Sequence, residues 1–363
     1  MSILDVFETD AFNMRSLTMA IDKLPYKPSR LGELGIFESK PQTTQFATVE
    51  DKQGILSLLP VQPRGQYNMT AKGPKRRKLH SFQIPHVPQT DAVYAADLVG
   101  RRAFGSESEA EVFASLVNER LADMKQNHEA TWEYQRIGCI NGIVLDADGS
   151  TQIANYFTDW GVTQTTVNLD FTDNGTYSAP QPVVDMKVFC TAVVRTMQKA
   201  LGASTFSGLH GFCGNLFFDA FVTHATVKKA WEYQQTGERN LWLRENQVPD
   251  GMGNAKTFEF GEITWENYRG FIGNVPFFAD TSAVIIPEGV KGLFIEAPGP
   301  ADFVETVNTP GRPIYVKQER MKFDMGIELY TESNILFLCT RPAALIGVTG
   351  INIPTVEFAN LVS

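Results

Sequence analysis

The chain has few cysteines and no long apolar run. Its four cysteines, Cys139, Cys190, Cys213 and Cys339, are far apart in 363 residues and stand among apolar neighbours. This pattern predicts four reduced core thiols, not a disulfide framework or a zinc site. No stretch of about 18 apolar residues is present, and the first eight residues lack the features of a signal peptide. We therefore expect no metal, no cofactor, no membrane span and a cytoplasmic product.

Acidic residues are missing from the window 53–90, although the chain as a whole is acidic. The window carries six basic residues, whereas 26 basic and 41 acidic residues elsewhere leave the rest at −15 and the whole chain at −9. Such a balance speaks against a surface built throughout to coat nucleic acid or an anionic membrane. It favours a self-complementary contact in which the basic segment of one copy lies on the acidic body of the next. The six are Arg64, Lys72, Lys75, Arg76, Arg77 and Lys78.

Length and composition are those of an ordinary folded chain. Hydrophobic residues make up 43% and charged residues 20%, which excludes disordered and fibrous classes. At about 150 residues per domain, the length predicts two or three structural units.

The first 105 residues predict extended structure. Prolines at 25, 28 and 41 are typical of an extended arm over 1–42. β-branched residues predict strands from 43 to 60. The basic window then predicts a long protruding hairpin over 53–90, with turn residues at 72–75.

A long helix is the strongest secondary-structure signal. Ser106 and Glu109 form a capping box, and a stretch without glycine or proline runs to Arg136. Apolar residues and His128 recur there at steps of three and four. Short strands are expected at 140–145, 152–157 and 162–171, with a turn at 146–149.

The second half predicts mixed structure. A helix from 183 should end at Gly202, and helices should resume from about 215 to 235. Strands are expected up to 294, at 313–319 and at 325–340, before an apolar tail.

Two glycine motifs and one thiol invite chemical interpretations. Residues 208–214 (GLHGFCG) lack the lysine and spacing of a phosphate loop, so a strand-to-helix junction is the better hypothesis. Residues 146–149 (DADG) lack the further ligands of a calcium loop and predict a hairpin turn. Cys213 with His210 or His224 could be a nucleophile and base, but a buried structural cysteine is commoner. A catalytic site is not expected.

Several segments resemble the major capsid proteins of tailed bacteriophages with the Hong Kong 97 fold, and most closely the lambda-type branch. They occur in the family's order over nearly the whole chain. The segments are 24–32 (LPYKPSRLG), 265–270 (WENYRG), 301–311 (ADFVETVNTPG), 332–334 (ESN) and 340–342 (TRP).

The resemblance implies an α+β fold with six parts. They are an N-terminal arm (1–42); peripheral-domain strands (43–105) with the extended hairpin loop at 53–90; the spine helix and peripheral sheet (106–180); an axial domain (181–318); return strands of the peripheral domain (319–347); and a C-terminal tail (348–363).

It also implies structural anchors in the family motifs. Asp302, Glu305, Asn308 and Arg312 are expected to fix the path back from the axial domain through turns and side-chain hydrogen bonds. The full set of motif anchors is Tyr268, Arg269, Gly270, Asp302, Glu305, Asn308, Pro310, Gly311, Asn334, Arg341 and Pro342.

The implied function is self-assembly, not catalysis. Copies would form hexamers and pentamers of an icosahedral head that encloses double-stranded DNA without sequence-specific binding. Scaffold and portal proteins, and a decoration protein in place of covalent cross-links, are the expected partners. The location would be the virion, after assembly in the bacterial host cytoplasm. A cellular encapsulating shell and a cytoplasmic α+β enzyme are the alternatives.

Overall fold

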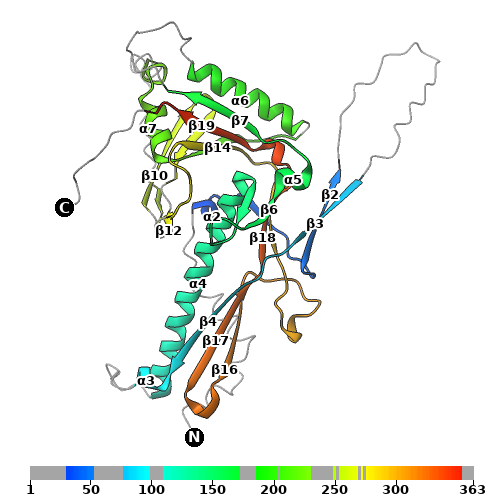
Figure 1. Cartoon of the computed structure of the whole chain (residues 1–363), viewed down its shortest axis with the longest axis vertical. Coiled ribbons are helices and arrows are strands. Elements are labelled where there is room, and N and C mark those ends of the chain that lie inside the picture. The colour runs from blue at the N-terminus through cyan, green and yellow to red at the C-terminus, as the bar shows by residue number, and fades with distance from the viewer. Residues whose placement is uncertain are drawn as a thin grey trace, which may run out of the picture. The chain divides into compact units, whose positions relative to one another are not determined.

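Long strands, one long helix and a seven-stranded sheet organise the chain in the computed structural model (Figure 1). The chain divides into two compact units. The first combines Met1–Ala47, Ser81–Arg136 and Phe294–Leu338, and the second combines Thr48–His80, Ile137–Leu293 and Cys339–Ser363. The structure describes residues 30–52, 77–98, 109–171, 185–202, 204–229, 248–250, 253–268, 271–272 and 275–353.

The first unit is built on helix α4 (Glu109–Asn141) and an antiparallel sheet of three long strands. The strand order is β16 (Tyr315–Arg320), β17 (Gly326–Ser333) and β4 (Val87–Tyr94). Leu116, Val117, Leu121 and Met124 are buried along the helix, as the three- and four-residue spacing requires. The last residues of α4 belong to the second unit.

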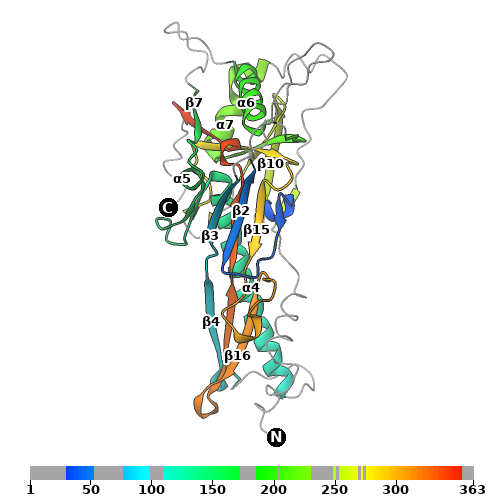
Figure 2. The same ribbon diagram turned by 90° about the vertical axis from the view of Figure 1, so that its right-hand side faces the viewer.

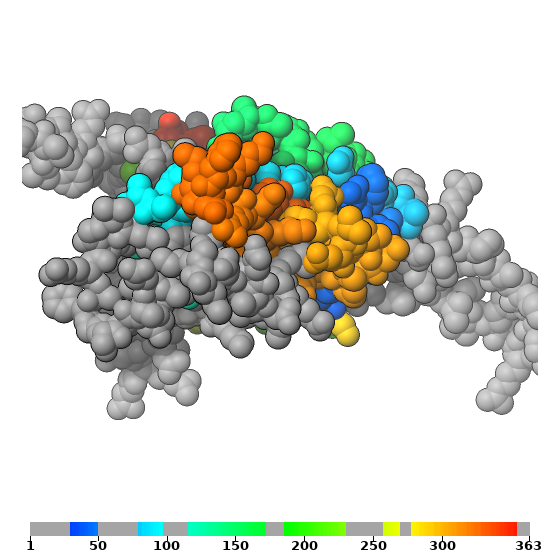
Figure 3. All heavy atoms as spheres, turned by 90° about the horizontal axis from the view of Figure 1, so that it is seen from below, coloured from blue at the N-terminus to red at the C-terminus, as the bar shows by residue number. Residues whose placement is uncertain are grey.

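A smaller sheet completes the first unit. It joins β1 (Phe37–Ser39), β15 (Phe294–Pro298) and β18 (Ile335–Cys339), and β1 runs parallel to β15. The short helices α2 (Arg30–Leu34) and α3 (Ala95–Leu98) and the 3₁₀ turns η3 (Val304–Thr306) and η4 (Lys322–Asp324) lie in its connections. Figure 3 shows the two 3₁₀ segments at the surface, in gold and orange.

The second unit is built on a seven-stranded mixed sheet. One face packs against α6 (Met186–Leu201) and α7 (Asn215–Thr223) through a core that includes Met197, Phe217, Phe221 and Trp265. The strand order is β7 (Thr165–Asp170), β19 (Ile346–Ile351), β14 (Ser282–Glu288), β8 (Gly208–Cys213), β11 (Ile263–Asn267), β10 (Gly253–Phe260) and β9 (Val248–Asp250).

Shorter elements surround these sheets. They are the hairpin β5 (Ile143–Leu145) and β6 (Gln152–Asn155), helix α5 (Tyr156–Trp160), the pair β12 (Phe271–Ile272) and β13 (Val275–Pro276), and the 3₁₀ turn η5 (Pro342–Ala344). The strands β2 (Phe46–Lys52) and β3 (Arg77–Gln83) pair with each other and appear as neighbouring arrows in Figure 2.

Local predictions with a strong chemical signal are confirmed. Residues 208–214 are a strand-to-helix junction, since β8 ends at Cys213 and α7 begins at Asn215. Residues 146–149 turn between β5 and β6, and the Asp148 carboxylate accepts the N–H groups of residues 150 and 151. Gly202 ends α6 with φ +61°. All four cysteines are free and buried.

Three element boundaries are wrong in the prediction. The strand expected at 140–145 begins only at Ile143, because α4 continues to Asn141 and buries Cys139 and Ile140 within the helix. Residues 156–160 form a helix, not strand, since Asn155 caps its start and Gly161 ends it in the left-handed region. The helix from 215 stops at Thr223; residues 225–229 are again helical, and 230–247 lie outside the described residues.

The hairpin and the tail also differ from expectation. The first strand of the hairpin is β2, upstream of position 53, while β4 pairs with β17 in another sheet. The expected tail from 348 begins inside β19. Val348 is buried there between β14 and β7, so residues 348–351 are part of the core sheet.

Candidate assembly and anchor sites

The basic loop connects β2 to β3. Residues 53–76 lie outside the described residues, so the structure gives the paired strands at the base of the loop and not the loop itself. The backbone of Arg77 and Lys78 opens β3, but their side chains also lie outside the description. The contact role of the six basic residues stays a prediction. Those outside entirely are Arg64, Lys72, Lys75 and Arg76.

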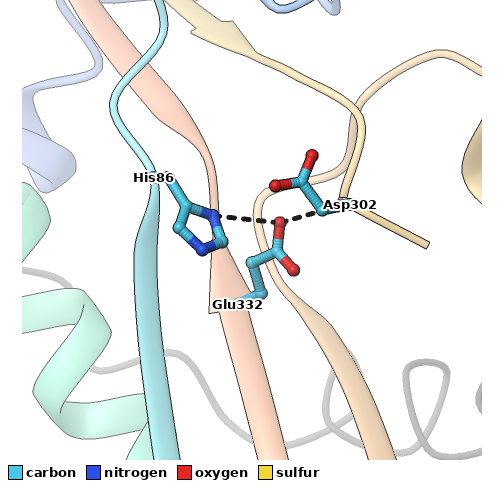
Figure 4. A group of neighbouring side chains, drawn as sticks. All are labelled: His86, Asp302 and Glu332. Atoms are coloured by element: carbon cyan, nitrogen blue, oxygen red, sulfur yellow. Dashed lines mark hydrogen bonds and ion pairs between the residues drawn. The ribbon is translucent and has the colours of Figure 1, made fainter.

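A buried carboxylate joins separate segments of the first unit (Figure 4). Glu332, near the end of β17, has a fully buried side chain. Its Oε1 accepts hydrogen bonds from the backbone N–H of Asp302 at 3.1 Å and from the amide of Asn334 at 2.5 Å. Nδ1 of His86 lies 3.3 Å from the same oxygen. Two of the predicted anchors, Asp302 and Asn334, therefore meet on Glu332, which the list of anchors did not include.

The same side chains have a composition that can ligate a metal. Within the described ranges, His86, Asp302 and Glu332 form the one group of three whose ligand atoms lie within 4.8 Å of one another, and an imidazole with two carboxylates suits a divalent cation. However, Oε1 of Glu332 already accepts two hydrogen bonds, and Oδ1 of Asp302 accepts one from Gln45 at 3.2 Å. These bonds account for the arrangement as a structural junction.

Backbone geometry holds the loop 301–312. Asn308 adopts a left-handed φ of 61°, a conformation that asparagine tolerates better than most residues. The hydroxyl of Thr306 donates to the carbonyl of Ala301 at 2.6 Å. The N–H of Gly311 donates to the carbonyl of Gln42 at 2.8 Å. The turn at 308–311 therefore positions Gly311 to hydrogen-bond the backbone of Gln42.

The remaining predicted residues of this loop have weaker contacts. Glu305 is exposed and lies 3.8 Å from Lys317, which is exposed as well; such pairs contribute about 0–1 kcal/mol. Pro310 is exposed. The backbone N–H of Arg312 donates to the hydroxyl of Tyr315 at 2.9 Å.

The other motif residues lie in the second unit. Tyr268 is buried, its N–H donates to the carbonyl of Cys213 at 3.0 Å, and its ring contacts that of Phe278. Arg341 donates to the carbonyl of Leu201 at 3.3 Å and to the hydroxyl of Ser204. Pro342 is buried at the start of η5. Arg269 and Gly270 lie outside the described residues. The motif residues thus form separate clusters, and the Asp302–Asn334 junction is one of them.

A polar stripe on α4 was missed by the sequence analysis. Nε2 of His128 lies 2.9 Å from the hydroxyl of Thr331, and the indole N–H of Trp132 donates to Ser333 at 2.8 Å. Burial lowers the pKa of His128 to about 4, so the ring is neutral at physiological pH. The spacing by four residues was a signal for this stripe, but it does not distinguish a buried face from a solvated one.

Further along the same helix, Glu133 binds the N-terminal part of the unit. Its fully buried carboxylate accepts the N–H of Leu31 at 2.9 Å. The Arg136 guanidinium lies 3.7 Å from Glu133 and 3.3 Å from Glu296. Helix α4 is therefore fixed to β17, β15 and α2 by buried polar contacts.

The first unit thus packs the long helix α4 against a sheet of long strands. A sequence profile described as phage major capsid protein E matches residues 13–349. The chain belongs to this family. The match covers most of the chain and includes every segment on which the resemblance rested.

Individual relatives agree with the assignment. The major capsid protein of Salmonella phage Felix O1 is 22% identical over 94% of this chain and 97% of its own length. That of Pseudomonas phage KPP10 is 24% identical over 92% and 96%. A chain described as a prophage capsid protein from E. coli CFT073 has a crystal structure that matches with a TM-score of 0.53 at 10% identity, covering 93% of this chain and 99% of that one. This last match shows a shared fold.

The family assignment settles the broad function. The chain is a major capsid protein of a phage head, with the α+β Hong Kong 97 fold, and its place is the capsid of the virion. Capsid subunits associate with copies of themselves. Among the described residues, no helix is long and apolar enough to cross a membrane.

Proposed function

We propose that this capsid protein forms the hexamers and pentamers of an icosahedral head that encloses double-stranded DNA. The family match over residues 13–349 is the observation that carries the proposal. A net charge of −9 supports it, because a negative wall does not grip densely packed DNA. The same proposal has three further parts. The protein belongs to the lambda-type branch, it has no catalytic role, and it assembles in the bacterial host cytoplasm.

The two units support an assignment of domains. The first unit, with α4 as the spine helix, corresponds to a peripheral domain, and the second, with its seven-stranded sheet, to an axial domain. Residues 1–42 would be the arm and the loop after β2 the extended loop. The axial domain would then include β7 and β19 in addition to most of the expected range 181–318, because these strands complete its sheet.

We also propose that the basic loop of one copy lies on an acidic face of the next. The sheet of the first unit supports this. Glu319 on β16 and Glu328 on β17 stand directly opposite each other, and both are exposed. Like charges in this register destabilise a strand pair. A neighbouring loop that carries six cations would relieve the repulsion, whereas a solvated monomer would retain it.

Charge reversal of the loop tests this proposal. Changing Lys75, Arg76, Arg77 and Lys78 together to Glu should block shell assembly and leave the subunit folded. One exposed ion pair contributes about 0–1 kcal/mol, but four reversed charges accumulate at every contact of the shell. Light scattering after size-exclusion chromatography, with electron microscopy, measures the outcome.

A matched control reverses four exposed cations of the second unit. These are Lys187, Arg195, Lys199 and Lys291. If the control assembles and the loop variant does not, then position matters and not only net charge. Adding Glu319→Lys and Glu328→Lys to the loop variant should restore part of the assembly. Normal heads from the loop variant would refute the contact.

Scaffold and portal proteins and a decoration protein at capsomer junctions are the further partners that we propose. Decoration predicts a shell without covalent cross-links, although Lys72, Lys75 and Lys78 are available for isopeptide bonds. Such a bond needs a neutral amine, and these lysines stand in a strongly polar segment.

Gel electrophoresis of mature heads under denaturing conditions distinguishes a shell without covalent cross-links from one joined by isopeptide bonds. We expect a single band at the mass of the chain, 40.3 kDa. A ladder of covalent oligomers that survives reductant would show that the heads are cross-linked.

A further inference from the structure

A buried histidine lies between two carboxylates in the second unit, and nothing in shell assembly described above uses it. Nε2 of His210 lies 2.9 Å from Oε2 of Glu266, and its Nδ1 lies 2.8 Å from Oε1 of Glu288. The side chains of His210 and Glu266 are 5% and 0% exposed, and that of Glu288 is 34% exposed. The group is therefore exposed to solvent mainly at Glu288.

The three residues come from three neighbouring strands at the centre of the sheet. The order is β14, β8 and β11, so Glu288, His210 and Glu266 bridge both strand pairs. Alternate residues of these strands, such as Ile285 and Trp265, point into the core under α6 and α7. The triad consequently lies on the opposite face of the sheet.

The two short contacts of His210 determine how many protons the triad must hold. A neutral imidazole has one N–H, and an ionised carboxylate can only accept. To make both hydrogen bonds at once, the three groups must hold two protons. Either His210 is an imidazolium with two N–H groups, or its ring is neutral and one of the two carboxyl groups is protonated. When one of these protons leaves, a ring nitrogen lone pair faces a carboxylate oxygen at less than 3 Å, and the attraction turns into repulsion.

We propose that His210, Glu266 and Glu288 form a proton-dependent clamp that holds β8, β11 and β14 together and loosens when a proton leaves through Glu288. The proposal goes beyond the assembly function and does not depend on it. A clamp of this kind makes the stability of the central sheet respond to pH.

The electrostatic surroundings of His210 support the proton-loaded state. Burial lowers the pKa of His210, but the hydrogen bonds and charges of Glu266 and Glu288 together outweigh it and raise the pKa above the ordinary value of 6.5. The Phe212 ring stacks on the imidazole at 4.4 Å and adds no charge.

Two further titratable groups of the same sheet, Glu259 and Cys213, are compatible with this state. Glu259 on β10 lies in register with His210 through Thr264, two strands away. It is exposed, so solvent screens its charge. The Cys213 thiol is buried, which raises its pKa, so it stays neutral. Glu266 and Glu288 each have a further interaction besides the one with His210.

The sign of the pH dependence follows from linkage. A group whose pKa is raised in the folded state stabilises fully below its unfolded pKa, and this stabilisation is lost as pH rises through the folded value. The clamp is therefore fully closed below about pH 6.5 and opens progressively as the pH rises through the raised pKa of His210. In that window the equilibrium constant for opening the sheet should rise by up to about tenfold per pH unit.

Histidine-selective ¹³C labelling of the full-length, unassembled subunit tests the clamp directly. The ring of His210, assigned by its loss in His210→Gln, should titrate above about pH 6.5. Glu288→Gln should lower this midpoint by roughly one pH unit. Glu259→Gln, an exposed carboxylate of the same sheet, is the matched control and should leave the midpoint almost unchanged.

Hydrogen exchange gives the structural readout. In the wild type, the protection factors of β8 and β14 should fall as the pH rises. In Glu288→Gln this fall should begin at a lower pH, and in His210→Gln the protection factors should not depend on the clamp's titration at all. If His210→Gln does not fold, the comparison of Glu288→Gln with Glu259→Gln still decides. A His210 midpoint at or below about 6.5, or equal midpoints in these two variants, would overturn the proposal.

Discussion

Gly311→Ala should destabilise the first unit by about 3 kcal/mol or more and prevent the assembly of normal heads. A Cβ at this position would lie 2.2 Å from the carbonyl oxygen of Pro298 and 2.5 Å from the carbonyl carbon of Gly299. Both are backbone atoms, one in the last residue of β15 and one in the residue after it, so neither can move aside as a flexible side chain could. The loop would have to move, which would break the hydrogen bond from Gly311 to Gln42 at 2.8 Å.

Thermal unfolding of the subunit, with electron microscopy of the heads, measures this effect. Gly347→Ala is the matched control, since its Cβ would meet the flexible end of Gln164 at 3.3 Å and no backbone atom closely. We expect the control to change stability by less than about 1 kcal/mol. Equal melting curves for the two variants would show that the close backbone contact at Gly311 does not stabilise the loop.

Glu332→Ala should cost about 1–3 kcal/mol for each hydrogen bond that loses this buried acceptor. The backbone N–H of Asp302 and the amide of Asn334 both donate to this carboxylate. The loss should appear in denaturant unfolding of the subunit as a lower midpoint.

Two further variants separate charge from shape at this junction. Glu332→Gln keeps the size and one acceptor oxygen, so it should cost less than the alanine variant. Glu305→Ala removes an exposed carboxylate of the same unit that lies 3.8 Å from Lys317, and it should cost less than about 1 kcal/mol. If Glu332→Ala is as mild as Glu305→Ala, the junction does not stabilise the unit.

Local chemistry explains which parts of the fold were predictable. The spacing of apolar residues predicted the buried face of α4 from Leu116 to Met124, and Gly202 predicted the end of α6. Glycine with aspartate predicted the turn after β5. These signals act within a few residues, so they do not need the rest of the chain.

The contacts of the predicted anchors depend on more than local sequence. The family motifs pointed to Asp302, Asn334 and Gly311, and the structure gives each of these a defined hydrogen bond. They did not single out Glu332, on which two of these residues converge. A charged residue in a β-strand is usually solvated, and the sequence of β17 does not show that this carboxylate is buried.

The sequence by itself determined the class of protein, the long helix, the local turns, the reduced cysteines and the separation of basic and acidic charge. Each depends on residue types at short spacing or on motifs in a known order. The tertiary structure alone decided that β19 joins the central sheet next to β7, that Glu332 is buried under donors from remote segments, and that His210 lies between Glu266 and Glu288. The physical reason is that burial and hydrogen-bond partners depend on which distant segments pack together, and a residue's neighbours in sequence do not specify them.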